Sequence, residues 1–216
     1  MSTAEMKRSR YGAAIVLIAP AVLAGGLLTH PYIGLGPPDP ANVAAAVAAD
    51  TTRWGIAHLM VAVGSGLMIL AFVALGALLR TAGERRWVEL AVPFAVFGSA
   101  LFMLPPAFEF APLVVAEIGG NIEKAQSALL PWFLPVLLIG ACVFAVGAVG
   151  FAISIHRSRI LSMPLTLCVA GSLAMIAVSR LVPLIAVQLY VQAAVGLLAL
   201  WPLAYRMWRD PGVQPR

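Results

Sequence analysis

The stretch that decides the fold is WGIAHLMVAVGSGLMILAFVALGALLR, residues Trp54–Arg80. Between its two ends it contains one ionisable side chain, His58, in a sequence of apolar and small residues. An α-helix needs about 20 apolar residues to cross the roughly 30 Å hydrocarbon core of a bilayer. The segment exceeds that length, so it predicts a transmembrane helix.

Five further stretches of the chain are also long and apolar enough to be transmembrane helices. The chain has 216 residues, of which 62% are hydrophobic and 11% are charged, and this composition is too apolar for a soluble domain. We therefore expect an all-α, polytopic membrane protein that forms a single integral membrane domain over residues 1–216. The six predicted spans cover about residues 11–30, 54–80, 87–108, 130–155, 160–180 and 183–206.

The basic residues divide unevenly between the two ends of these spans. Of the 14 Lys and Arg residues, only Arg53, Lys124 and Arg180 fall at one end. Because loops rich in Lys and Arg stay in the cytoplasm, we expect a multi-pass protein of the cell membrane with both termini cytoplasmic. Because the basic residues lie at span ends, the net charge of +5 is explained without a nucleic-acid partner. The residues at the cytoplasmic end are Lys7, Arg8, Arg10, Arg80, Arg85, Arg86, Arg157, Arg159, Arg206, Arg209 and Arg216.

Two of the predicted outer connections are long, and each is expected to contain a short helix. In the first, Asp39-Pro40 is typical of a helix start and the alanines that follow predict a helix over residues 40–49. In the second, Gly119-Gly120-Asn121 predicts a break, followed by a second short helix that ends at Leu130, where the fourth span begins. The two hairpins are either an internal duplication or unrelated.

Two histidines are predicted to lie at similar depth near the outer face. His30 ends the first span, and His58 follows Trp54 by four residues, about 6 Å along the second span. Imidazole is both a ligand and a proton carrier, so the two rings either share a site or hydrogen-bond locally. One version of the shared site uses both rings as axial ligands of the iron of a haem b.

Three charged residues are predicted on the same side. Glu109 follows Pro105-Pro106, where the third span should unwind, and Glu117 has apolar neighbours. Arg180 is the only basic residue between about residues 160 and 205. Ionisable groups at membrane depth tend to face a cavity and find partners, so we expect Arg180 to pair with Glu109 or Glu117. The alternative is that Arg180 extends to the outer headgroups.

Polar residues without charge add a second group of candidates. Gln188 and Gln192 lie four residues apart on one helix face, and two amides in a span need partners, either between helices or around a pocket. Cys142 and Cys168 fall within spans and are interpreted as small buried residues and not as a disulfide. The sequence contains no Gly-rich phosphate loop and no His-Glu-x-x-His helix.

Three functional hypotheses follow from these residues. The first is a binding, carrier or accessory membrane protein with an outer-facing polar pocket for a small molecule, lipid headgroup or ion. The second is a haem b-binding redox protein, and the third is a membrane enzyme that acts on a lipid-linked substrate, with no catalytic residue assigned. The expected partners are the lipid bilayer, a small-molecule or lipid ligand, and a second copy or a larger membrane complex. The predicted ligand-binding residues are His30, His58, Glu109, Glu117, Arg180, Gln188 and Gln192.

Overall fold

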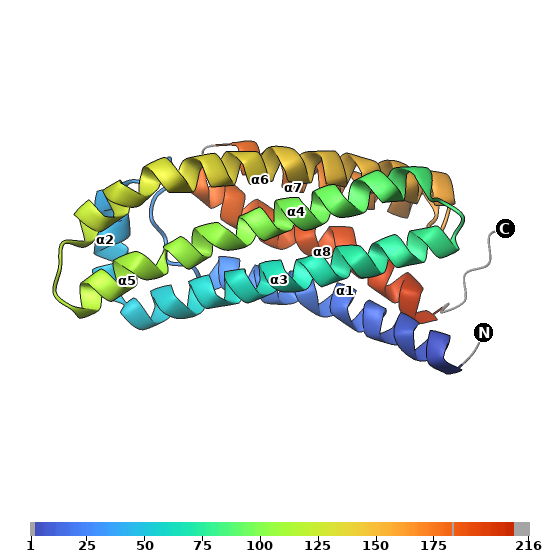
Figure 1. Ribbon diagram of the computed structural model, residues 1–216, viewed down its shortest axis with the longest axis horizontal. Coiled ribbons are helices and arrows are strands. Elements are labelled where there is room, and N and C mark those ends of the chain that lie inside the picture. The colour runs from blue at the N-terminus through green and yellow to red at the C-terminus, as the bar shows by residue number, and fades with distance from the viewer. Residues whose placement is uncertain (1–2, 183, 210–216) are drawn as a thin grey trace.

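The computed structural model describes residues 3–182 and 184–209, and within these ranges it has eight helices and no strand (Figure 1). The short helices α2 and α5 lie at one end of the bundle, opposite the start of α1 and the end of α8, and we call this the α2/α5 end. The helices are α1 (Thr3–Thr29), α2 (Pro40–Ala49), α3 (Thr51–Thr81), α4 (Arg86–Phe108), α5 (Phe110–Glu117), α6 (Ile122–Ser158), α7 (Met163–Leu181) and α8 (Ile185–Arg209).

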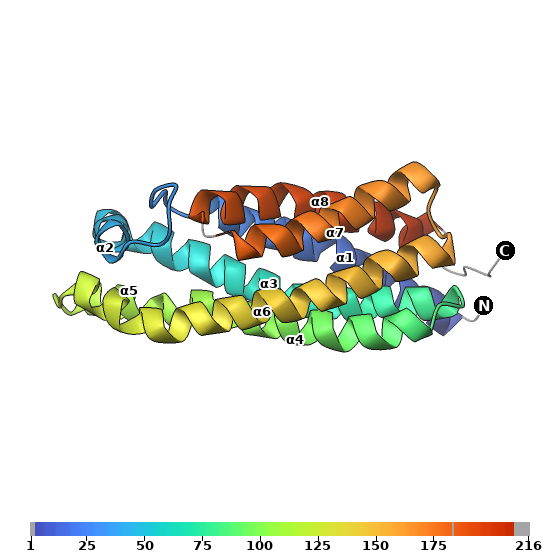
Figure 2. The same ribbon diagram turned by 90° about the horizontal axis from the view of Figure 1, so that it is seen from above.

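The long helices are arranged as a closed ring. Six helical stretches in the described chain are long and apolar enough to cross a membrane, as the sequence predicts. Long helices that follow one another in the chain pack side by side, and α8 closes the ring by packing against α1. The ring therefore runs α1, α3, α4, α6, α7, α8 (Figures 1 and 2). This arrangement gives the bundle an interior that all six long helices surround.

Side-chain caps fix the starts of α2 and α3 at the α2/α5 end. The carboxylate of Asp39 accepts a hydrogen bond from the backbone N–H of Ala41 at 3.0 Å, and Asp50 accepts one from Arg53 at 2.8 Å. Such caps satisfy backbone donors that a helix start leaves free. The predicted helix over residues 40–49 is confirmed, because α2 has these bounds.

The predicted position of the second short helix was wrong. The short helix α5 precedes the turn at Gly119, whose φ of +71° suits glycine, and α6 then runs without a break to Ser158. Asn121 caps α6 by accepting from the N–H of Lys124 at 2.8 Å. The helix continues past Leu130 into the predicted fourth span, although Pro131 and Pro135 each remove a backbone N–H from it.

The middle of the ring is filled by apolar side chains. The ring of Phe72 on α3 lies 5.6 Å from that of Phe144 and 5.3 Å from that of Phe151 on α6, and all three residues are fully buried. Helices α4 and α6 approach very closely, since a Cβ on Gly98 would lie 2.6 Å from the backbone nitrogen of Phe144. Small residues at such crossings are typical of membrane helix pairs.

The two cysteines differ from the sequence interpretation. Cys142 and Cys168 are exposed on the surface of the bundle and not buried in it. Both lie within long apolar helices, α6 and α7, where an exposed face would contact lipid in a bilayer. Small size and low polarity suit a cysteine to either environment, so the sequence alone does not distinguish the two faces.

Candidate functional site

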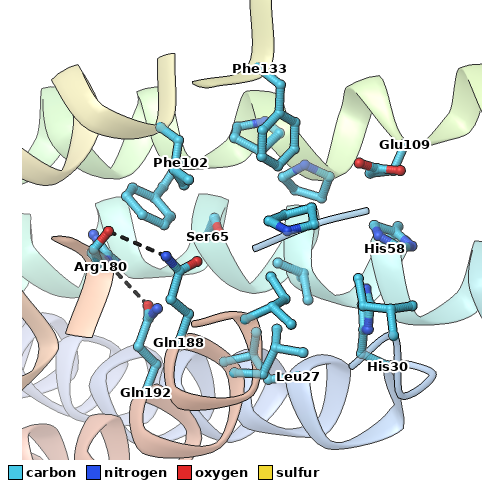
Figure 3. Close-up of a pocket in the computed structure, with 18 of the residues that line it drawn as sticks. Leu27, His30, His58, Ser65, Phe102, Glu109, Phe133, Arg180, Gln188 and Gln192 are labelled. Carbon is cyan, nitrogen blue, oxygen red and sulfur yellow. Dashed lines mark hydrogen bonds between the residues drawn. The ribbon is translucent and has the colours of Figure 1, made fainter. Parts of the chain in front are cut away.

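A pocket opens into the ring at the α2/α5 end, and most of the predicted polar residues line it. The cavity has a volume of about 110 Å³. Its walls come from α1, α3, α4, α6, α7 and α8, and the polar side chains gather on two sides of it (Figure 3). The structure thus brings together six residues that were predicted as one site, namely His30, His58, Glu109, Arg180, Gln188 and Gln192.

Helix α2 covers part of this pocket. It packs against α3, α5 and α6, and its buried Val43 lines the cavity. Val43 and Val47 form a small separate core with Ile33 and Trp54. Trp54, the first residue of the predicted second span, is only 1% exposed. Its ring is held in this core by apolar contacts from α2, so α2 shapes the wall of the site.

Arg180 is the central residue on one side of the pocket. It lies near the end of α7, is 5% exposed, and its guanidinium carbon is 3.7 Å from the ring centre of Phe102 and 4.1 Å from that of Phe144. Aromatic faces attract a cation and fix the plane of a guanidinium. Its Nε donates a hydrogen bond to Oε1 of Gln192 at 3.0 Å, whereas its buried Nη1 has no partner among the described residues.

The two glutamines hold the end of α7 against α8. Gln192 accepts from the Arg180 side chain, and Gln188 donates to the carbonyl oxygen of Val182 at 2.8 Å and to that of Arg180 at 3.5 Å (Figure 3). Arg180 lies in the last turn of α7 and Val182 is the residue that caps it, so no further helical N–H is present to bind these carbonyls. Of the two roles considered for these amides, the structure shows both, since they join helices and line the pocket.

Glu109 lies on the opposite side of the pocket, at the junction of α4 and α5. It is 7% exposed, and its Oε1 accepts a hydrogen bond from Nε2 of Gln126 on α6 at 3.0 Å. The indole Nε1 of Trp54 donates to the backbone carbonyl of Glu109 at 3.0 Å. Oε2 of Glu109 and Oε1 of Gln126 are buried without a partner among the described residues.

The histidines are neighbours of Glu109. The rings of His30 and His58 lie 4.9 Å apart, and each also contacts the ring of Trp54, at 5.3 and 4.4 Å. Nδ1 of His30 is 2.7 Å from the carbonyl oxygen of Pro31, and Nδ1 of His58 is 2.8 Å from that of Trp54. A carbonyl oxygen only accepts, so Nδ1 carries the proton in both rings, and Nε2 of a neutral ring is left as an acceptor.

The ring of His30, which follows the first helical stretch that is long and apolar enough to cross a membrane, is biased toward its neutral form. Burial lowers the pKa of His30 below its usual 6.5, and the positive charge of Arg53 lowers it too, while the hydrogen bond to the Pro31 carbonyl acts in the opposite direction. Burial has this effect because a charged imidazolium loses its hydration in a low-dielectric site.

Two predictions about charged residues were wrong. Glu117 is the last residue of α5 and is exposed, and it does not line the pocket. Arg180 pairs with amides and aromatic rings, and the ion pair within the described ranges joins Arg157 to Glu84 at 2.9 Å. The physical reason is that Glu117 falls on an exposed position at the end of α5, whereas Arg180 is buried in the ring interior on the side of the pocket opposite Glu109 (Figure 3).

The two histidines do not fit the axial ligation of a haem. With each metal–nitrogen bond at about 2 Å, two axial imidazoles stand roughly 6 Å apart between centroids, on opposite faces of the macrocycle. The observed rings are 4.9 Å apart in an edge-on contact, and Trp54 touches both. No cluster of three or more His, Cys, Asp or Glu side chains suited to a metal ion occurs in the described ranges.

No family model, curated protein or solved structure matches this chain significantly. The site therefore rests on its own geometry. Sequence reasoning missed Gln126, which was placed in an outer connection, and the aromatic clamp of Phe102 and Phe144. A phenylalanine inside a span has no feature that separates a clamp from ordinary core. Gln126 lies in a segment with other polar residues, Glu123, Lys124 and Ser127, so its polarity did not distinguish it.

Proposed function

We propose that this chain is an integral membrane binding or carrier protein, and that its pocket takes a small molecule or lipid headgroup with an anionic group. The observation that supports this proposal is Arg180. Its guanidinium is buried, no carboxylate lies within 4.0 Å of it in the described ranges, and its Nη1 has no hydrogen-bond partner. An anionic ligand would supply both the missing charge and the missing acceptor.

The free energy lost by burying the Arg180 cation without a counter-charge is the physical argument for a ligand. A buried cation loses its hydration, and aromatic contacts and one amide hydrogen bond compensate only part of that loss. Arginine is also the side chain best suited to carboxylate and phosphate, because its N–H groups form a planar fork that matches their oxygens. Ionisable residues retained at membrane depth commonly mark a substrate or ion pathway.

The distribution of basic residues between the two ends of the bundle indicates from which side of the membrane a ligand reaches the pocket. Ten of the 11 Lys and Arg residues predicted at the cytoplasmic end belong to described segments at the end opposite the pocket, which favours a cytoplasmic location for that end, and Arg216 lies outside the described residues. On this orientation the pocket faces the outer side of the cell membrane, and its ligand arrives from outside or from the outer leaflet. Charge asymmetry supports the orientation, which we treat as part of the proposal.

The proposal is tested by ligand-dependent stabilisation of protein purified in a nonionic detergent. The probes are inorganic phosphate, ethyl phosphate, butyrate and phosphoethanolamine. A ligand that binds only the folded state raises the unfolding midpoint, so we expect a rise for at least one probe in the wild-type protein. The rise should vanish in Arg180→Gln and persist in Lys124→Gln, which removes an exposed cation at the same end of the bundle.

Two results decide against the proposal. One is an unchanged midpoint with all four probes, in protein that native mass spectrometry shows to be free of bound lipid. The other is an equal rise in the wild-type protein and in Arg180→Gln, because binding would then not depend on the buried cation. Size-exclusion chromatography of each variant checks that the fold is retained.

A further inference from the structure

We infer that the ligand of this pocket is a small zwitterion, whose anionic group faces Arg180 and whose primary ammonium group faces Glu109, His30 and His58. This inference rests on the proposed function and adds the chemical class of the ligand. It is based on the side of the pocket opposite Arg180, where the unpaired groups are hydrogen-bond acceptors and not donors.

Glu109 is the first observation. Its carboxylate is 7% exposed, receives one hydrogen bond from Gln126, and keeps Oε2 without a partner in the described ranges. A buried carboxylate needs donors for several lone pairs, and leaving them empty is costly. A donor group that enters the pocket would bind Oε2 directly, because Glu109 lines the cavity.

The histidines are the second, independent observation. Each ring uses Nδ1 as the donor to a backbone carbonyl, so Nε2 of the neutral ring offers only a lone pair. Nε2 of His30 and Nε2 of His58 have no partner within the described chain, and both rings line the same cavity as Glu109. Oε2 and the two Nε2 atoms give this side of the pocket free acceptors, which suits a primary ammonium because that group has N–H donors and no acceptor.

The separation of the two charges is the third observation. Arg180 and Glu109 line one cavity but do not form an ion pair, and Figure 3 shows them on opposite sides of it, with Ser65 and Leu27 between. One unpaired cation and one unpaired carboxylate, held apart in a low-dielectric pocket, are complementary to a dipolar molecule. A simple anion would leave Glu109 unpaired, and a simple cation would leave Arg180 unpaired.

The size of the cavity limits the ligand. Its volume is about 110 Å³, whereas pockets that enclose drug-sized molecules measure roughly 300–1,000 Å³. This space suits a short amino acid with separated charges, or the headgroup of an aminophospholipid. Both have the same chemistry, a carboxylate or phosphate joined by a short chain to a primary ammonium.

The test compares ligands that differ only in the ammonium group. The phosphate series is phosphoethanolamine, phosphocholine and ethyl phosphate, and the carboxylate series is 4-aminobutyrate, its N-trimethyl derivative and butyrate. Binding is measured by calorimetry on full-length protein in a nonionic detergent. We expect the primary ammonium compound of at least one series to bind about tenfold or more tightly than the other two members, which corresponds to about 1.4 kcal/mol.

Variants then assign the ammonium group to its site. In Glu109→Gln, which keeps the shape of the side chain, the preference for the primary ammonium over the compound without one should fall below about threefold, because a charge-assisted hydrogen bond is lost. Binding of ethyl phosphate or butyrate itself should change little, since Arg180 is intact. Glu123→Gln is the matched control, because Glu123 is an exposed carboxylate at the same end of the bundle.

The source of the headgroup is distinguished by native mass spectrometry of protein purified from membranes. Retained phosphatidylethanolamine in the wild-type protein, lost in Glu109→Gln and in Arg180→Gln, identifies a lipid headgroup. Binding of the soluble compounds to lipid-free protein identifies a free zwitterion. Either result supports the inference.

Two outcomes overturn the inference, and only the second also overturns the proposed function. If ethyl phosphate or butyrate binds as tightly as its primary ammonium analogue in wild-type protein, the zwitterion is wrong and the anion-binding function stands. If no compound binds and no lipid is retained, the proposed function fails together with the zwitterion. The first comparison needs no variant, so it holds even if Glu109→Gln does not fold.

Discussion

Glu109 and Gln126 are 17 residues apart, on opposite sides of the turn at Gly119, and their buried side chains meet in a hydrogen bond of 3.0 Å. The bond joins the α4–α5 junction to α6 directly beside the pocket. It is the one side-chain hydrogen bond that the Glu109 carboxylate makes within the described ranges. The position of this carboxylate in the pocket wall therefore depends on a residue of another helix.

We predict that Gln126→Leu destabilises the protein by about 1–3 kcal/mol, because it leaves the buried Glu109 carboxylate without its donor. Unfolding by titration with sodium dodecyl sulfate measures the loss. Ser127→Ala, one position along α6 and exposed, serves as control and should have little effect. The double variant Glu109→Leu/Gln126→Leu should recover much of the loss, since no unpaired polar group remains. A double variant that is less stable than Gln126→Leu would contradict this account.

The contact between α4 and α6 leads to a prediction about glycine. A Cβ at Gly98 would lie 2.6 Å from the backbone nitrogen of Phe144, and one at Gly147 would lie 2.5 Å from that of Ala95. Gly98→Ala and Gly147→Ala should each cost about 1–3 kcal/mol, because the helices must separate. Gly171→Ala, also within a helix, meets no atom within 4 Å and should be neutral or stabilising. Thermal unfolding midpoints in detergent compare the three, and equal behaviour would refute the close contact.

The orientation in the membrane gives a third prediction. A reporter protein that is active only in the cytoplasm should be active when fused after Arg216 and inactive when inserted between Gly119 and Gly120. The reason is the excess of Lys and Arg at the end opposite the pocket. The reverse pattern of activity would place the pocket on the cytoplasmic side and would contradict the proposed access from outside.

The pH dependence of stability should depend on His30. Burial holds the pKa of His30 below 6.5, so between its folded and unfolded values only the unfolded chain takes up the proton. This contribution to stability is complete above pH 6.5 and is lost as the pH falls below it. Between about pH 7.5 and about pH 5.5, the unfolding midpoint of the wild-type protein should fall more than that of His30→Gln.

The neighbours of His30 set the controls for that measurement. His58 and Arg53 face this ring and are present in both proteins, so the difference between the two curves reports the charge of His30 together with its effect on these two neighbours. His156→Gln, at an exposed position on the other end of the bundle, should follow the wild-type curve. Identical curves for wild-type and His30→Gln would show that the ring protonates freely in the folded protein.

Local physics explains what was predicted correctly from the sequence. The length and apolarity of each span, and the start of α2 at Asp39-Pro40, depend on residues close together in the chain. Polar residues such as His58 and Arg180 were placed at one end of the bundle because position along a helix measures depth. Length, capping and depth thus determined six apolar helices, one short helix, and a set of polar residues toward one end of the bundle.

Only the tertiary structure decided which of those residues meet. Whether Arg180 faces Glu109 or Gln192 depends on the rotation of each helix about its axis and on the order of helices around the ring. Neither quantity is set by hydropathy, because a hydrophobic side chain is equally suited to lipid and to the bundle interior. For the same reason Gln126 joined the site, Glu117 remained outside it, and the cysteines faced outward.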